Sequence, residues 1–243
     1  MKTDSMRRTE KALESAIHSI IKTQNFDGFK VLNRIATAKH ADAPTDLQVK
    51  HVAEWYKDQP RTRHTERTAD AYAAFRRECI LQYDALTSAL DVDLCSIAEP
   101  YESAQSMRSK VLESGRLDIR CTRTFSDLPD WHALNGLAKR FNGSYVRQSS
   151  RYNDAPVLTY NDAFRAVHDG LTHVLGGENT PFDLHGEFRA VLMHSTLFSR
   201  TAQPALWNEA FAQICRHDQT GQFPSQKMNA FPLSWVDKFQ PWS

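Results

Sequence analysis

The run AYAAFRRECILQYDALTSAL at residues 71–90 decides the fold class. It lies in a segment, 66–90, that is rich in good helix formers and is interrupted by neither glycine nor proline. This composition predicts one long helix. Apolar residues at helical spacing predict further helices on both sides of it, over 9–22, 28–38, 46–57, 102–113, 162–175, 186–198 and 202–216.

Strand signals are few. LDIRCTRTF at 117–125 alternates apolar and polar residues, which predicts a strand. Residues 126–156 hold two prolines and an Asn-Gly pair without a periodic run, which is typical of loops with short elements, and PVLTY at 156–160 reads as a short extended segment. The predicted fold class is therefore mainly α with a small β element (α+β).

Length and charge leave the function open. The 243 residues carry 30 Lys and Arg against 29 Asp and Glu, a net charge of +1 that demands no polyanionic partner. We expect an N-terminal helical region at 1–65, a main domain at 66–218 and a tail at 219–243 that packs back on the body. No span suits a bilayer and the first residues do not resemble a signal peptide, so we expect a cytoplasmic protein.

The four cysteines, Cys79, Cys95, Cys121 and Cys215, contain no CxxC pair. A zinc knuckle or a disulfide framework is therefore not expected, and we interpret them mainly as buried thiols.

Four of the ten histidines fall in RAVHDGLTHVLGGENTPFDLHGEFRAVLMH, residues 165–194. On a regular α-helix Asp169 and His173 share a face, whereas His168 lies about 140° away from His173. Glu187 and His194 share a stripe of the next helix but are about 10 Å apart along its axis. Both cannot readily bind one metal from a straight helix, so one of them would be a ligand and the other would support the metal site or contact substrate.

Three interpretations of this cluster remain open. Imidazole and carboxylate suit Zn, Fe or Mn, so the candidate metal ligands are His168, His173, Glu187 and His194. A metal-free site would use His168 or His194 as general base, oriented by Asp169 or Glu187. Alternatively the cluster is structural and bridges the helices. Arg165 is a candidate for binding an anionic substrate.

A resemblance adds to this reading. Residues 72–216 resemble a poorly characterised family of bacteriophage and mobile-element proteins, through AFRRECILQYDAL, EPYESAQSMRSKV, NDAFRAVHDGLTH, GEFRAVLMH and FSRTAQPALWNEAFAQ. The family pattern covers His168, Asp169, His173, Glu187 and His194, followed by Glu209 and Gln213. Gly170, Leu171 and Thr172 depart from it, as does Phe188, which stands where a second acid or amide is common.

The resemblance implies a site and no particular reaction. It favours His168, Asp169, His194 and Glu209 as catalytic residues, and it adds Tyr101, Arg108 and Gln213 to Arg165 as candidates for contacting substrate. The phage setting suggests a nucleotide or a nucleic-acid base as substrate, with the host cytoplasm or the virion as the location.

The function hypotheses belong to three classes. The first is a metal-dependent enzyme, either a hydrolase or a non-haem iron oxygenase; His168-Asp169 is an HD dyad, for which His132 and Asp218 are the available upstream and downstream partners. The second is a non-enzymatic virion or host-interaction protein with a structural His cluster and a docking tail. The third, weaker, is a nucleic-acid binder using residues 1–70, with net charge +3. The oligomeric state stays open.

Overall fold

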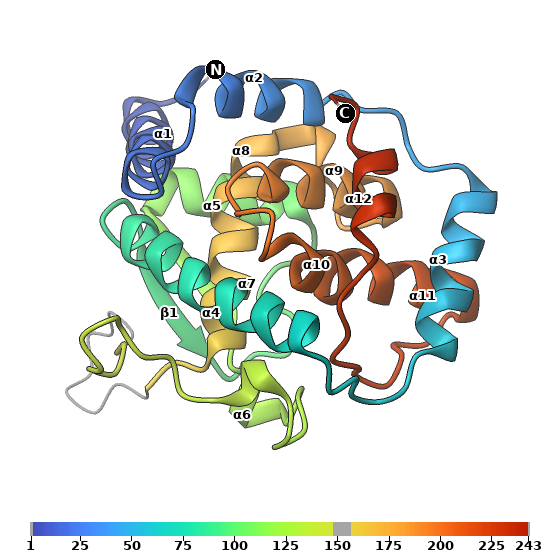
Figure 1. The fold of residues 1–243 in the computed structure, drawn as a ribbon. Helices are drawn as coiled ribbons and strands as arrows, with labels where there is room; N and C mark the ends of the chain where they lie inside the picture. Colours follow the sequence, from blue (N-terminus) through green and yellow to red (C-terminus); the bar gives the residue numbers. More distant parts are fainter. Residues whose placement is uncertain (1, 148–156, 243) are drawn as a thin grey trace. The chain divides into compact units, whose positions relative to one another are not determined.

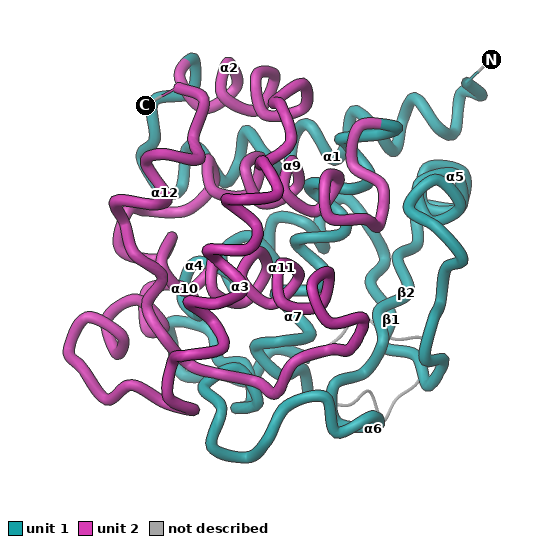
Figure 2. The backbone as a smooth tube through the Cα atoms, turned by 90° about the vertical axis from the view of Figure 1, so that its right-hand side faces the viewer, with its two compact units in different colours: residues 1–29, 76–178 teal, residues 30–75, 179–243 magenta. Residues whose placement is uncertain are grey.

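The computed structural model describes residues 2–147 and 157–242. It is mainly helical with a small two-stranded sheet, which confirms the predicted fold class (Figure 1). The chain divides into two compact units (Figure 2). Unit 1 holds residues 1–29 and 76–178, and unit 2 holds residues 30–75 and 179–243. Among the described residues, no helix is both long and apolar enough to cross a membrane.

Unit 1 is built around a parallel pair of strands, β1 and β2, which run in register from Asp91 opposite Arg116 to Cys95 opposite Arg120. The helix α5 connects them and α7 packs beside β2. The elements of this unit are α1 (Asp4–Thr23), β1 (Asp91–Cys95), α5 (Ala104–Ser114), β2 (Arg116–Arg120), α6 (Thr122–Phe125), η1 (Ala133–Asn135), α7 (Tyr160–His168), η2 (Asp169–His173) and α8 (Val174–Gly176).

Unit 2 is helical and has an aromatic core, in which Trp207 and Phe211 pack against Phe231 and Phe239. The last two residues belong to the C-terminal segment, so that segment is part of this core. Its elements are α3 (Asp46–Asp58), α9 (Leu184–Ser195), α10 (Gln203–Leu206), η4 (Trp207–Ala212), α11 (Gln213–Thr220) and α12 (Leu233–Phe239). Three elements cross unit boundaries: α2 (Gly28–Ala38), α4 (Glu66–Leu86) and η3 (Gly177–Asn179).

The helices lie close to their predicted places, although α4 ends at Leu86 rather than at residue 90. The strand predicted over 117–125 is partly wrong, because β2 ends at Arg120 and Thr122–Phe125 forms the short helix α6. The backbone amide of Thr122 donates to the carboxylate of Asp162 (2.8 Å), which stabilises the start of that helix. The strand β1 was not predicted, since only one of its five residues is buried.

The segment between β2 and α7 agrees with the prediction of loops as far as it is described. Residues 126–147 contain only η1 and isolated bridges, and 157–159 is extended, with bridges from Val157 to Arg147 and from Thr159 to Leu137. The predicted loop continues into 148–156, which lie outside the described residues. All four cysteines are free, and Cys79 and Cys215 are buried, whereas Cys95 and Cys121 are half-buried.

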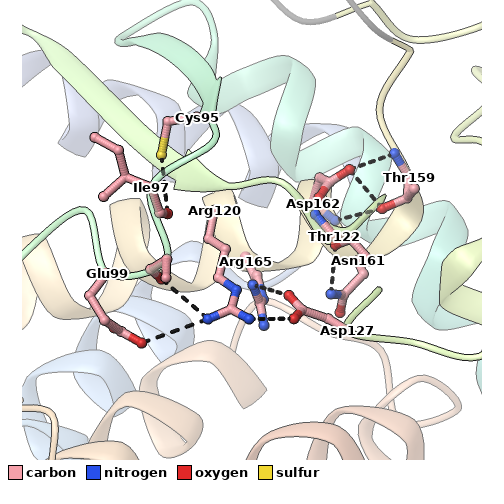
Figure 3. A network of polar contacts seen from close by, with 11 residues as sticks. Cys95, Ile97, Glu99, Arg120, Thr122, Asp127, Thr159, Asn161, Asp162 and Arg165 are labelled. Carbon is pink, nitrogen blue, oxygen red and sulfur yellow. Dashed lines mark hydrogen bonds and ion pairs between the residues drawn. The ribbon is translucent and has the colours of Figure 1, made fainter. Parts of the chain in front are cut away.

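A buried capping box fixes the start of α7, the helix that carries the first candidate histidine. The amide of Asp162 donates to the Thr159 hydroxyl (3.1 Å), and the Asp162 carboxylate accepts from the Thr159 amide (2.9 Å). The same carboxylate accepts from the amide of Thr122, the first residue of α6 (Figure 3). The start of α6, two residues after β2, and the start of α7 are therefore joined through one buried side chain.

Candidate metal site

A π-helical turn brings two of the candidate histidines together. The turn, η2, continues α7 directly and is followed by α8. The rings of His168 and His173 lie 5.0 Å apart between centroids and nearly perpendicular, at 78°. The expectation that these residues lie about 140° apart is therefore wrong. It assumed a regular α-helix, whereas a π turn is closed by hydrogen bonds between residues five apart, which places such residues on the same side.

Packing inside unit 1 holds this turn in place. His168 is buried and His173 is fully buried. A Cβ atom on Gly170 would lie 2.8 Å from a methyl carbon of Leu86, so glycine lets the turn approach α4 closely. The Thr172 hydroxyl donates to the His168 carbonyl, and Thr172 is itself buried. The two imidazoles are therefore presented by a closely packed backbone.

Arg108 fixes the helix just beyond the turn. Its Nε donates to the carbonyl of Val174 (3.1 Å), and its guanidinium forms an ion pair with Glu10 (3.3 Å). Arg108 was predicted to contact substrate. The structure shows that Arg108 also satisfies a backbone carbonyl at the end of the π turn.

The third member of the group is a carboxylate at the start of α9. Asp183 caps this helix by accepting from the amide of Gly186 (2.8 Å), which places Glu187 in its first turn. His168, His173 and Glu187 each offer one ligand atom, and these atoms lie within 4.8 Å of one another. Two imidazoles and a carboxylate are a set that could hold a divalent transition metal.

The other candidates of the cluster lie outside that group. His194 is fully buried and its ring lies 4.8 Å from that of Phe198. His194 follows Glu187 by two turns of α9. The distance along the helix axis expected between them explains why His194 lies outside the group. His185 is exposed. His132, the partner considered for the HD dyad, uses Nδ1 to accept from the amide of Leu134 (3.3 Å), and Asp218 is exposed.

Unit 2 contains a second buried polar group, centred on Glu209. This residue lies on another π-helical segment, η4. One carboxylate oxygen accepts from the Tyr72 hydroxyl and from Asn208 (3.1 Å), and the other accepts from Gln213 (3.1 Å). Burial, and then the negative charge of Glu209, raise the pKa of Tyr72 well above its usual value. Tyr72, Asn208 and Gln213 are all neutral donors to this carboxylate.

The sequence singled out Glu209 and Gln213 but gave no role to Tyr72 or Asn208, which belong to the same hydrogen-bond network. Asn208 also donates to the carbonyl of Lys227 (2.7 Å), which links the network to the C-terminal segment. One signal was available, since Asn208 and Glu209 interrupt the apolar run ALWNEAFA. Tyr72 gave no signal of this kind, because an aromatic residue in an apolar helix is normally read as core.

The two remaining substrate candidates, Tyr101 and Arg165, make contacts within unit 1. The Tyr101 hydroxyl accepts from the amide of Asp118 (2.7 Å), and burial raises the pKa of Tyr101. Arg165 pairs with Asp127 (2.9 Å), whose other oxygen pairs with Arg120 (2.7 Å), as Figure 3 shows. This ion-pair network stands near the carboxyl ends of the two strands.

Comparison with known proteins gives no support from homology. No family model matches the chain, and no significant match is found among curated proteins or solved structures. The candidate site therefore rests on its own geometry and chemistry.

Proposed function

We propose that the protein binds a divalent transition metal through His168, His173 and Glu187 and uses it in catalysis. The observation that carries this proposal is the convergence of their ligand atoms within 4.8 Å. Imidazole and carboxylate donors suit Zn, Fe and Mn, and a site with only three protein ligands leaves positions open for water or substrate. A bound metal of this kind supplies Lewis-acid or oxygen chemistry at those positions.

The local structure supports a functional reading over a purely structural one. π-helical turns are rare and occur frequently at functional sites. Here one such turn presents His168 and His173, and a second presents Glu209. Burial of imidazole and carboxylate groups also costs free energy that a structural cluster would avoid with apolar side chains.

The substrate class follows from the resemblance to phage and mobile-element proteins. We propose a nucleotide or a nucleic-acid base, with either hydrolysis or iron-dependent oxidation as the reaction. Metal identity separates these two reactions: zinc or manganese favours the hydrolase, and iron favours the oxygenase.

The test is the metal content of the purified full-length chain, measured by mass spectrometry after growth with added Zn, Fe and Mn. We expect near-stoichiometric metal in the wild type and a large loss in His173→Ala and in Glu187→Gln. His185→Ala is the matched control, because this histidine is exposed and stands outside the group. Circular dichroism should show that all variants are folded.

Wild-type protein that holds no metal after supplementation would contradict the proposal. If His173→Ala were then less stable than wild type, the cluster would be structural. The alternative of a virion or host-interaction protein would take its place, and the search would turn to partners of the C-terminal segment.

A further inference from the structure

Unit 2 contains a cavity that has no part in the metal site. It has a volume of about 220 Å³ and is lined by Gln48, His51 and Val52 on α3 and by Trp235, Lys238 and Phe239 on α12. We propose that this cavity binds a small aromatic anion, that is, one aromatic ring carrying a carboxylate or a phosphate.

The aromatic side chains of the cavity wall pack against other rings of unit 2. Trp235 packs against Trp55 (6.4 Å between ring centroids) and edge-on against Phe231 (5.8 Å). Phe239 stacks on Trp207, with the ring centroids 5.5 Å apart at 21°. Because both rings are anchored in the aromatic core, ordering them on binding costs little free energy.

The size of the cavity limits the ligand. An engineered cavity of about 150 Å³ holds one benzene molecule. A cavity of about 220 Å³ therefore takes one ring with a short substituent, and is smaller than the roughly 300–1,000 Å³ of pockets for drug-sized ligands.

The polar groups of the wall are suited to an acceptor-rich anion. Gln48 uses its side-chain oxygen to accept from the amide and hydroxyl of Thr45. Its NH2 group is therefore the end that remains for a ligand. Lys238 adds an ammonium donor and His51 an imidazole, and both side chains are exposed at the rim. Among the described residues, those that line the cavity include no carboxylate.

Two of the carboxylates on these helices are already paired with cations. Asp237 pairs with Arg200 (2.5 Å), and Glu54 pairs with Lys57 (3.0 Å). Lys238 forms no ion pair within the part of the chain that the structure describes. Its charge is therefore available to an anionic ligand.

The experiment is a ligand-detected NMR titration of the full-length chain with phenylacetate, up to about 10 mM. Phenylacetamide tests the need for the charge, cyclohexylacetate tests the need for the ring, and phenyl phosphate distinguishes the two anionic groups. We expect saturable binding of phenylacetate or phenyl phosphate, with each uncharged or non-aromatic analogue at least about fivefold weaker.

The variants are Lys238→Gln and Lys238→Glu, which change an exposed side chain and should fold normally. We expect binding to weaken at least about fivefold in the first and further in the second. Lys50→Gln is the matched control, since it removes the same charge from α3 outside the cavity.

The absence of saturable binding for both anions would overturn the proposal. An equal loss of affinity in Lys50→Gln would also overturn it, because attraction to the general surface charge would then account for binding.

Discussion

Gly186 shows how a single residue fixes the path of the chain before α9. A Cβ atom at this position would lie 2.0 Å from the carbonyl oxygen of Pro181 and 2.5 Å from its nitrogen. Backbone atoms cannot give way as a flexible side chain can. We therefore expect Gly186→Ala to destabilise the protein by about 3 kcal/mol or more in urea unfolding.

Gly136→Ala is the control for that prediction. Its added Cβ would meet no atom closer than 3.6 Å, which is an ordinary contact. Equal free energies of unfolding for the two variants would show that the close approach at Gly186 has no energetic weight.

Tyr72→Phe tests the buried network around Glu209. The substitution removes the hydroxyl that donates to Glu209 and accepts from Asn208 (3.0 Å). Both partners stay buried, so we expect a loss of about 2 kcal/mol of stability. In Tyr160→Phe the lost hydroxyl accepts from the amide of Lys139 (3.3 Å) at a more exposed place, and the loss should stay below about 1 kcal/mol.

For single residues, the sequence identified which residues belong to the candidate site better than it predicted where they lie in space. The spacing of His168, His173 and Glu187 singled them out, but periodicity assumes a regular helix and therefore misplaced the two histidines. The role of Tyr72 depends on Glu209, 137 residues later. No local pattern reports a contact at such a distance along the chain.

The capping boxes of α7 and α3 allow the same kind of helix cap to be tested once in a buried setting and once in an exposed one. Thr159→Ala removes a hydroxyl that both accepts from and donates to Asp162 in a buried setting. Thr45→Ala removes the corresponding hydroxyl at an exposed helix start. We expect the first to cost about 2 kcal/mol and the second about 1 kcal/mol or less, measured by urea unfolding.

Hydrogen exchange supplies a check on location. In Thr159→Ala the faster exchange should appear in α7 and at Thr122, because Asp162 joins them. Faster exchange in α3 instead would contradict this assignment.

The elements themselves were predicted unevenly. The helix predicted over 46–57 was found near its true ends (α3), because the apolar spacing repeats over several turns. The helix predicted over 9–22 ends close to its true end but starts five residues late, since α1 begins at Asp4. β1 was not predicted because Asp91–Cys95 is short and does not alternate clearly. One of its five residues is buried and the other four are half-buried. The strand predicted through residue 125 was too long because the contact of Thr122 with Asp162 comes from a distant segment.

Across the whole molecule, four buried tyrosines predict sensitivity to alkali. Burial raises the pKa of Tyr56, Tyr72, Tyr83 and Tyr101 in the folded protein. In the unfolded chain a tyrosine ionises near pH 10. The stability that these groups contribute is therefore complete below about pH 10 and is lost as the pH rises above it.

Absorbance at 295 nm and circular dichroism should be followed together during the alkaline titration. We expect part of the phenolate signal to appear only as the helical signal is lost. In denaturant all seven tyrosines should ionise together. A folded protein that ionises every tyrosine near pH 10 would refute the prediction.

The alternation of the chain between the two units has a consequence for synthesis on the ribosome. α3 packs against α11, which is translated roughly 150 residues later, or on the order of 10–30 s at about 5–20 residues per second. α1 likewise packs against α5, which is translated after it. Early helices therefore leave the exit tunnel with apolar faces that stay uncovered until the later helices have been made.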